Sequence, residues 1–414
     1  MNRQHGSNAY RWERLDALKD ASLENAIVAI RSILASTPAT LDQDPDWLEA
    51  KAKSPDRATR TYICRNRLGT VVGFAPFLLH PSSLEFAFGP LRFARIAFRR
   101  VSLTTGPLFS EDVLESGAAC ASLIDAAMRD LEGREVLFVL GMPLASPLAS
   151  ILDELQAFKK VLLLRHGPSY ERRLAKVPRS LDEYLAMLGS RTRQDLRRQE
   201  RRLVEEAGGT LTLAVYCDPS SVDDFVVDAE RVSTLTYQWA MIGQGVASNE
   251  ATKDLLRSAA TSGWFRGYIL HARGQPVAFM LGFLYGGNYL SETIGYDPRW
   301  ARWSVGNILH MNVMRDLASL SGSATWFDFL YGDNANKERL STDSHSEQNC
   351  YLLPRTTYWK MFLLSWNGFN RVTSSLSRFM SRYRIRDRVL SVLRRRASAR
   401  ALEQKAGLAN RKKS

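Results

Sequence analysis

Residues 264–330 carry the pattern that most constrains how this chain can fold. Alternating apolar and polar side chains predict three strands here, separated by short turns at Gly274 and at Gly286-Gly287. The predicted elements are strands at 264–271, 276–284 and 289–294, a helix at 304–320 and a strand at 324–330. Strands joined by turns this short pair antiparallel, so the segment predicts an α/β (α+β) unit built on a largely antiparallel sheet.

The same order of elements recurs in the first half of the chain. The sequence predicts a helix at 15–34, strands at 61–65, 70–79, 84–88 and 91–104, a helix at 110–131, a strand at 136–140, a helix at 147–158 and a strand at 161–165. No residue-level repeat is visible, so duplication is inferred from this order alone. The length of 414 residues agrees with two units, because single hydrophobic cores stop growing at about 250–300 residues.

The second unit is expected to begin after Pro178. Ser180 and Glu183 form a capping box, which predicts the start of a long, arginine-rich helix that ends at Gly208-Gly209. A strand at 211–216 and helices at 221–235 and 249–262 lead from there to the antiparallel strands. We therefore expect a first unit at 1–178, a second at 179–357 and a basic amphipathic helical tail at 358–414.

The net charge of +13 is concentrated at one end of the chain. Residues 371–414 contain 14 Lys and Arg against 2 Asp and Glu, a net charge of +12. The body is therefore nearly neutral, and it carries no basic-aromatic stripe of the kind that binds nucleic acid. The tail can lie on an anionic membrane surface, bind nucleic acid nonspecifically, or pack its apolar side on the body.

Other features favour a cytoplasmic protein. The four cysteines are far apart and form no CxxC pair, which favours reduced thiols. Residues 1–20 are polar and carry acids as well as bases, unlike a secretory signal, and no apolar run approaches the ~20 residues that a membrane helix needs. We expect a cytoplasmic location, with peripheral contact at the inner face of the membrane as a further option.

Several familiar chemistries lack their motifs. The six histidines show no ligand spacing, so we expect no metal, and the segment Asp343-x-His345-x-Glu347 is interpreted as a polar loop. Gly332 and Lys337 imitate a P-loop, but Glu338 stands where Ser or Thr would hold magnesium. Nucleotide hydrolysis is therefore rejected.

The start of the helix at 304–320 is a candidate anion site. Helix N-termini present free amides and a positive dipole end, and Gly306 would let a phosphate approach the backbone closely. Arg299 and Arg302 flank this start, and no acid follows in the helix until Asp316. The alternative interpretation is an ordinary capped helix whose glycine has no role.

Residues from about 180 to 351 resemble the GNAT superfamily of acyltransferases. More narrowly, they resemble the acetyltransferase domain of bacterial cellulose and exopolysaccharide biosynthesis proteins. The residues that carry the resemblance are Gly263-Trp264-Phe265-Arg266, Gln275-Pro276-Val277-Ala278, Tyr296-Asp297-Pro298, Trp303-Ser304-Val305-Gly306-Asn307-Ile308-Leu309, Phe327-Asp328, Gly332-Asp333 and Lys337. The Fem-type peptidoglycan aminoacyltransferases are a related group, built from two such folds in tandem.

The resemblance implies a tandem GNAT-like architecture and acetyl-CoA or another acyl-CoA as cosubstrate. In such folds a bent strand and the following helix start hold the pantetheine and pyrophosphate. The cofactor-binding residues implied here are Leu281, Phe283, Arg302, Ser304, Val305, Gly306 and Asn307. The acceptor would be a small molecule or glycan, such as a cell-envelope or exopolysaccharide sugar or its precursor.

Acyl transfer needs a base for the acceptor and a proton for the leaving thiolate. Candidate bases near strand ends are Glu292, Asp328 and Asp333, of which we favour Glu292 and Asp333; Tyr331 or Tyr296 could protonate the thiolate. Each carboxylate also has a structural explanation, since Glu292 fits a cross-strand partner and Asp328 the solvated face of its strand.

Asp328 and Lys337 are also candidate contacts to the acceptor. Ser110, Glu111 and Asp112 would place two carboxylates at the first-half helix start, where they would repel pyrophosphate, so only the second half is expected to bind CoA. The alternative functions are a Fem-like transferase that uses aminoacyl-tRNA and a noncatalytic accessory protein, bound to membrane or nucleic acid.

Overall fold

The computed structural model describes residues 9–382, without 16–23, 89–90, 112, 114–115, 237–244, 321 and 323. The predicted tail beyond residue 382 lies outside this range. The first half contains β1 (Arg11–Leu15), α1 (Glu24–Ser36), η2 (Leu41–Gln43), α2 (Pro45–Lys51), β2 (Ala58–Arg65), β3 (Val71–Phe88), β4 (Leu91–Thr104), β5 (Leu108–Phe109), α3 (Ser116–Arg129), β6 (Glu135–Pro143), α4 (Pro147–Ala157) and β7 (Leu162–Lys176).

The second half begins with two consecutive helices and ends with one long helix. It contains α5 (Leu181–Met187), α6 (Ser190–Glu206), β8 (Leu211–Tyr216), η3 (Pro219–Ser221), α7 (Val222–Ser233), α9 (Glu250–Thr261), β9 (Gly267–Ala272), β10 (Gln275–Tyr285), β11 (Asn288–Tyr296), η4 (Pro298–Trp303), α10 (Val305–Ser319), β12 (Trp326–Asp328), α11 (Ala335–Leu340), β13 (Asp343–Leu353) and α12 (Thr357–Arg382).

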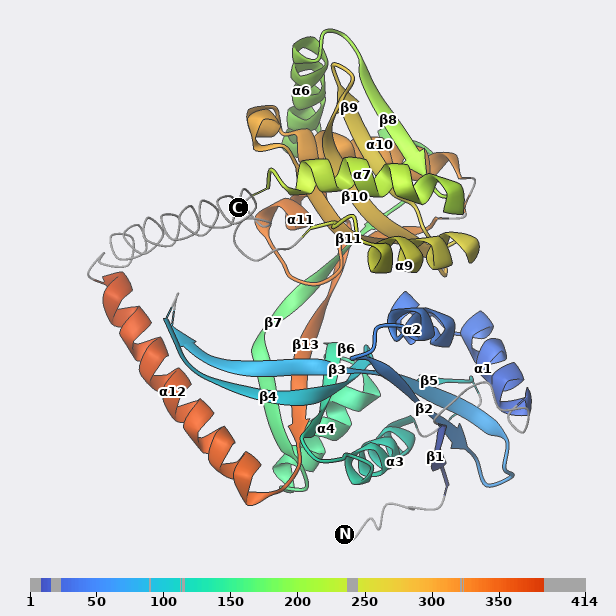
Figure 1. Ribbon diagram of the computed structural model, residues 1–414, viewed down its shortest axis with the longest axis vertical. Coiled ribbons are helices and arrows are strands. Elements are labelled where there is room, and N and C mark those ends of the chain that lie inside the picture. Colours follow the sequence, from blue (N-terminus) through green and yellow to red (C-terminus); the bar gives the residue numbers. More distant parts are fainter. Residues whose placement is uncertain are drawn as a thin grey trace, which may run out of the picture.

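The strands form one continuous sheet whose order mirrors the duplication. The order is β1-β2-β3-β4-β6-β13-β7-β12-β11-β10-β9-β8, with β5 paired to β3 (Figure 1). In each half the sequential strands pair antiparallel, and the strand after the helix joins in parallel, β6 to β4 and β12 to β11. The predicted fold class is confirmed: two α/β units of the same element order, each with a largely antiparallel sheet flanked by helices, followed by a C-terminal helix.

Two long strands, β7 and β13, are exchanged between the halves. β7 continues beyond the predicted 161–165 and pairs with β12 of the second half, while β13 lies between β6 and β7. Ten residue pairs join β7 to β13 (Figure 1). Each of these strands completes the sheet of the other half, so the two units share one framework.

Separate apolar clusters pack each face of the sheet. In the first half α3 and α4 cover one face. In the second half α5, α6 and α10 cover one face and α7 and α9 the other. Trp47 of α2 crosses to the second half, where its ring lies 4.8 Å from that of Phe283. The helix α2 therefore closes the space between the two units above the exchanged strands.

Several predicted boundaries need correction. Leu15, the first residue of the predicted helix at 15–34, is the last residue of strand β1, and the first described helix begins at Glu24. The arginine-rich helix is interrupted at Leu188, whose backbone is extended, and restarts after Gly189. The remaining predicted helices and strands of residues 211–330 are present with ends shifted by a few residues, because local pattern does not define where tertiary contacts stop an element.

The predicted acidic start of the first-half helix is wrong. The helix α3 begins at Ser116, and its first turn contains no acid. Ser110 instead follows β5, where its amide donates to the Val72 carbonyl. Glu111 therefore does not lie at a helix N-terminus, and electrostatic repulsion there cannot explain a difference between the two halves.

Candidate active site

A large cavity lies where two parallel strands separate. β11 and β12 are paired over three residues only, from Asn288 with Trp326 to Leu290 with Asp328. β11 then continues to Tyr296, and over this part β10 is its only partner among the described strands. The resulting gap holds a cavity of ≈ 640 Å³. Its lining comes from β10, β11, β12, η4, α10, α11 and the loop between β12 and α11.

The equivalent strands of the first half do not separate. β4 and β6 are paired over six residues, from Arg99 with Glu135 to Thr104 with Leu140. The amide of Thr105 extends the pairing by donating to the Leu140 carbonyl at 2.7 Å. The two halves thus differ in strand pairing at the position where the second half has its cavity.

The start of α10 forms one wall of the cavity. Val305, Gly306 and Asn307 line it, and the first turn carries no acid. Ser304 precedes the helix in the left-handed region (φ 57°) and its side chain makes no capping hydrogen bond, so it leaves the first amides free. Asn307 Nδ2 donates to Gln199 Oε1 of α6 at 3.0 Å, which fixes α6 beside this helix start. The arrangement suits an anion.

Glu292 is the extra residue of a β-bulge in β11. Ser291 pairs with Gly282 and Thr293 pairs with Leu281, which leaves Glu292 without an opposite residue on β10. A bulge bends its strand and redirects side chains, and it is common beside active sites. The family resemblance implied a bent strand at Leu281 and Phe283 of β10. The pairing is irregular between Leu281 and Gly282, but the inserted residue belongs to β11.

The Glu292 carboxyl group lies between two cavities. Glu292 lines the large cavity and also a second, small cavity of ≈ 30 Å³. The small cavity is lined by residues of both halves, including Asp42, Lys51 and Arg172. Its side chain is exposed toward these spaces while protein atoms surround it on the other sides. Desolvation, with the nearby Asp42, raises the pKa of Glu292, and Lys51 opposes the shift. This environment favours a carboxylate that can take up a proton.

Tyr331 lines both cavities beside Glu292. Burial raises the pKa of its phenol well above the ordinary value, so the group stays protonated. Its ring lies 5.5 Å from the guanidinium carbon of Arg172. Gly141 of β6, with φ 62°, makes room for this ring, because a Cβ there would stand 2.9 Å from Tyr331 Cε1. A residue of the first half thus shapes the site.

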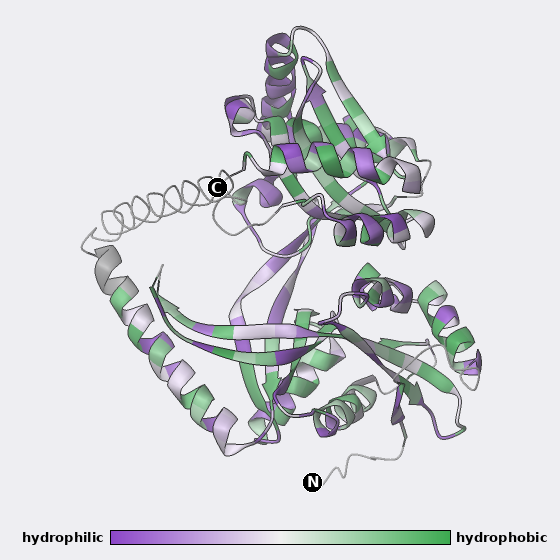
Figure 2. Cartoon of the chain, in the orientation of Figure 1, coloured by the Kyte–Doolittle hydropathy of each residue, from purple (hydrophilic) through white to green (hydrophobic). Residues whose placement is uncertain are grey.

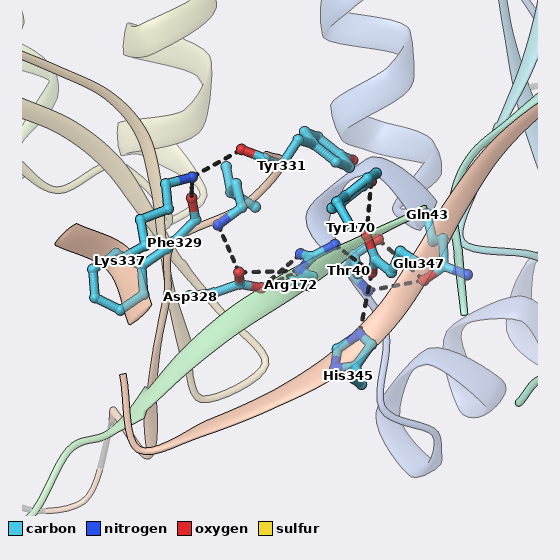
Figure 3. Close-up of polar contacts among 11 residues, drawn as sticks. Thr40, Gln43, Tyr170, Arg172, Asp328, Phe329, Tyr331, Lys337, His345 and Glu347 are labelled. Atoms are coloured by element: carbon cyan, nitrogen blue, oxygen red, sulfur yellow. Dashed lines mark hydrogen bonds and ion pairs between the residues drawn. The ribbon is translucent and has the colours of Figure 1, made fainter. Parts of the chain in front are cut away.

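A buried ionic network joins the exchanged strands (Figure 3). Arg172 of β7 donates through Nε and Nη2 to the carboxylate of Asp328 on β12, at 2.6–3.0 Å, and through Nη1 to Glu347 on β13 at 3.2 Å. Tyr170 Oη donates to Glu347 at 2.9 Å, and His345 Nε2 lies 3.1 Å from the same carboxylate. The network holds β7, β12 and β13 together beneath the small cavity.

The network changes the interpretation of three sequence predictions. Asp328 is buried rather than on a solvated strand face, and it does not line the large cavity. The segment with His345 and Glu347 belongs to strand β13 rather than to a polar loop. Among the described residues, no group of three or more His, Cys, Asp or Glu side chains is arranged to hold a metal ion.

Lys337 lines the large cavity, but its ammonium is already occupied. Nζ donates to the carbonyls of Phe329 and Tyr331 at 2.7 and 2.8 Å (Figure 3). It also donates to the carbonyl of Gly332 at 3.0 Å. An ammonium has three protons, so all its donors are used within the loop. Burial lowers the pKa of Lys337. The lysine therefore fixes the loop that carries Tyr331.

The other predicted residues are spread around the site. Asp333 does not line the cavity; both oxygens accept from Arg173 at 3.0 Å, and this contact lowers the pKa of Asp333. Leu281 and Phe283 are buried in the cluster under α7 and α9, and neither lines the large cavity. Arg302 stacks on Trp303 with 3.8 Å between guanidinium carbon and ring centre. Tyr296 lines the cavity near Gly306.

His310 lines the large cavity and had no role in the sequence analysis. Its Nε2 lies 2.9 Å from Tyr184 Oη, whose proton is directed to the Leu340 carbonyl at 2.6 Å. Burial lowers the pKa of His310 to about 3, so the ring is neutral. Because Tyr184 uses its proton elsewhere, Nε2 carries the histidine proton, and Nδ1 is an acceptor without a partner among the described residues.

The residues that sequence reasoning missed come mainly from the first half. Arg172 lies in the part of β7 beyond the predicted strand at 161–165. The residues after His166 are mostly polar, so their sequence indicates a strand only weakly. Lys51 and Asp42 lie in and before α2, more than 200 residues from Glu292 in sequence. No local pattern could have joined them to the site.

Comparisons with known proteins concern the family and the fold. Residues 190–338 match the family described as acetyltransferase (GNAT) domain. The crystal structure of FemX superposes with a TM-score of 0.56 at 12% identity, covering 84% of this chain and 99% of that one. A tandem GNAT protein from the clavulanic acid biosynthesis pathway gives 0.49 at 12% identity, covering 83% and 98%. No curated protein sequence matches the chain.

Proposed function

We propose a chemistry for a chain that carries a GNAT-superfamily domain and has a Fem-related fold. The chain is a transferase that uses an acyl-CoA to acylate an amine or hydroxyl group. The observation that carries the proposal is the cavity between the separated strands β11 and β12. It is lined both by the start of α10, whose first turn has no acid, and by Glu292, the residue of the β-bulge. The acceptor is a cell-envelope or exopolysaccharide sugar or its precursor, and this part rests on the sequence resemblance alone.

The donor is expected to bind along the gap between β11 and β12. The free amides of Val305 and Gly306 face the cavity and can bind a pyrophosphate, with Arg302 nearby as a second source of positive charge. The edge of β11 beyond Leu290 has no strand partner in the gap, so its amides can polarise a thioester carbonyl. We therefore transfer the carbonyl-binding role from Leu281 and Phe283 to β11.

Glu292 is proposed as the general base. The acceptor attacks the thioester carbonyl carbon while Glu292 takes its proton. The tetrahedral intermediate then collapses, and the carbon–sulfur bond breaks. The carboxylic acid formed at Glu292 returns the proton to the thiolate, and Tyr331, which stays protonated, donates a hydrogen bond to the sulfur. No net proton is lost in this sequence.

The acceptor is proposed to approach from the first half. The small cavity shares Glu292 and Tyr331 with the large one and is bordered by Thr40, Asp42 and Lys51. The first half would then serve as the acceptor-binding unit, while its own paired strands leave no donor site. Asp328 would contribute indirectly, by holding Arg172 at the wall of this cavity.

One observation favours a second candidate, an aminoacyl-tRNA donor. α6 lies beside the start of α10 and presents exposed arginines, of which Arg191, Arg201 and Arg202 make no ion pair or hydrogen bond with other described residues. A row of free guanidinium groups can bind the phosphates of an RNA. FemX shares the fold, which by itself does not assign a donor.

Direct binding distinguishes the two donors. We expect acetyl-CoA or a longer acyl-CoA to raise the unfolding temperature and to give a calorimetric Kd, and free thiol to appear only when an acceptor is present. Stabilisation by aminoacyl-tRNA, without any by acyl-CoA, would establish the second candidate. Binding of neither donor would leave the accessory-protein interpretation.

We also propose a location at the cytoplasmic face of the membrane. No helix among the described residues is long and apolar enough to cross a membrane. The charge of +12 on residues 371–414 would instead attract the chain to an anionic surface, at about 1 kcal/mol for each basic residue that reaches it. Such a position would suit a lipid-linked or membrane-proximal acceptor.

A further inference from the structure

The helix α12 packs only one side against the body. Trp359, Phe362, Trp366 and Phe369 face the β3–β4 hairpin, and Phe86 of β3 contacts the last three of these rings at 5.2–5.8 Å. Figure 1 shows the helix running alongside this hairpin. These contacts define the inner side and fix the orientation of the helix.

The outer side of α12 is also apolar. Of 17 exposed large apolar side chains among the described residues, seven lie on this helix or on the adjoining hairpin end, and no second region gathers as many. We define the docking face by these seven: Leu91, Phe93, Tyr358, Met361, Leu364, Val372 and Leu376. Figure 2 shows apolar residues recurring along the length of the helix. Phe93 lies 5.7 Å from Phe369, which joins the hairpin end to the helix.

The charges around the docking face are mainly positive. No Asp or Glu occurs between Glu347 and Asp387, a stretch that includes the whole of α12. Lys360 and Arg371 are exposed on the helix, and Arg92 and Arg95 are exposed on β4 beside Phe93. Among the described residues, Glu85 of β3 approaches Arg92 at 3.4 Å. An apolar face with a basic border is typical of a helix that lies in a membrane interface.

We propose that the docking face inserts into the surface of an anionic lipid bilayer. This interaction is separate from attraction by the tail, because it depends on apolar burial and not on charge alone. It is also independent of the proposed transferase chemistry, since none of its residues lines either cavity at Glu292.

The charges decide between a bilayer and other occupants. Residues 383–414 carry 11 Lys and Arg against 2 Asp and Glu, so this segment would be repelled by the basic border. A second copy of the chain would bring the same positive face. Nucleic acid is anionic, but its bases stack on aromatic rings, whereas five of the seven docking residues are aliphatic or Met. Acyl chains beneath anionic headgroups match both the apolar and the basic parts.

The test uses the full chain and two triple variants of matched exposure. Phe93→Ser, Leu364→Ser and Val372→Ser remove apolar groups from the docking face, at 64%, 67% and 67% exposure. The control variant carries Val28→Ser, Leu68→Ser and Val227→Ser, which remove exposed apolar groups outside the docking face, at 67%, 89% and 56% exposure. Sedimentation with phosphatidylglycerol–phosphatidylethanolamine vesicles is measured at 0.1 M and 1 M salt. Circular dichroism and the unfolding temperature check that all the proteins fold.

We expect the docking-face variant to bind vesicles at least tenfold more weakly at 0.1 M salt, and the control variant to match the parent. The parent should retain part of its binding at 1 M salt, where charge attraction is screened, and the docking-face variant should lose it. Equal binding of all three proteins would overturn the proposal. The proposal would also be overturned if, without vesicles, the parent formed dimers and the docking-face variant stayed monomeric. The docking face would then bind a second copy of the chain.

Discussion

Glu292 combines three properties that are seldom found in one carboxylate. It is the inserted residue of a bulge, it borders two cavities, and its pKa is raised by desolvation. Asp333, the other favoured base, differs in all three respects and is neutralised by Arg173. At the scale of single residues, the site therefore separates two candidates that the sequence left equal.

Glu292→Gln should keep CoA affinity and lose about 10²–10⁴-fold in turnover, the usual contribution of a general base. The matched control is Asp333→Asn, which should stay near the parent rate because its ion pair with Arg173 lies outside the cavity. Steady-state thiol release and calorimetry measure the two quantities. Equal turnover in the parent and the Glu292 variant would mean that another group or water takes the proton.

The dependence of kcat/KM on pH should show the ionisation of Glu292. A base acts in its ionised form, so kcat/KM should fall as the pH drops through the pKa of Glu292 in the free enzyme. Because desolvation raises this pKa, the acid limb should lie above the ordinary glutamate value of about 4.3. An acid limb at or below that value would contradict the assignment.

Gly306 tests the anion site at the start of α10. A Cβ there would meet Tyr296 at 3.5 Å, an ordinary contact, so Gly306→Ala should keep CoA affinity. Gly306→Asp places a carboxylate beside the pyrophosphate and should weaken binding by roughly 1–3 kcal/mol. Calorimetry of both variants measures the difference. Identical affinity in the two variants would refute pyrophosphate binding at this helix start.

At the scale of elements, the exchanged strands β7 and β13 support one wall of the candidate site. They bring Arg172, Glu347 and Tyr170 against β12 and position the loop that carries Tyr331. Gly141 of β6 contributes the space for that tyrosine. The candidate active site is therefore assembled from elements of both halves, although the proposed donor side belongs to the second.

Arg172→Met should destabilise the fold by about 3–5 kcal/mol, because it leaves two buried carboxylates without their cation. Arg173→Met is the matched neighbour: its pair with Asp333 is more exposed and should contribute at most about 1 kcal/mol. Urea unfolding of both variants gives the comparison. Equal losses would show that burial does not strengthen the role of Arg172.

At the scale of the whole molecule, one sheet contains two units, and these units differ in how far their two parallel strands are paired. The second half separates β11 from β12, whereas the first half keeps β4 and β6 paired over six residues. The first half thus has the same element order, but its strands β4 and β6 stay paired where the second half has the gap. The predicted boundary near residue 178 follows β7, and the strand exchange makes the units interdependent.

The chain should bind one acyl-CoA. A second site would require β4 and β6 to part, which breaks the backbone hydrogen bonds of paired strands. Calorimetric titration with acetyl-CoA should therefore give a stoichiometry near one, and Gly306→Asp should weaken this single binding event and leave no second event of parental affinity. A stoichiometry of two would show that the first half also binds the donor.

The sequence alone determined the element order and the family resemblance. Alternation and turn residues are local, so the antiparallel strands at 264–294 and the acid-free start of α10 could be predicted from residues close together in the chain. The same local signals identified Glu292, Tyr331 and Gly306 as candidates. They could not rank Glu292 against Asp333, because desolvation depends on distant atoms.

Only the tertiary structure decided how the halves cooperate. The exchange of β7 and β13 depends on pairing between residues more than 160 positions apart, such as Leu174 and Asp343, and no local pattern encodes such contacts. The burial of Asp328 under Arg172 likewise joins residues 156 positions apart, and the opening between β11 and β12 lies where the pairing of strands distant in sequence stops. Sequence periodicity specifies which face of an element is apolar. Long-range packing decides what that face contacts, and here it decides that Glu292 and not Asp333 lines the cavity.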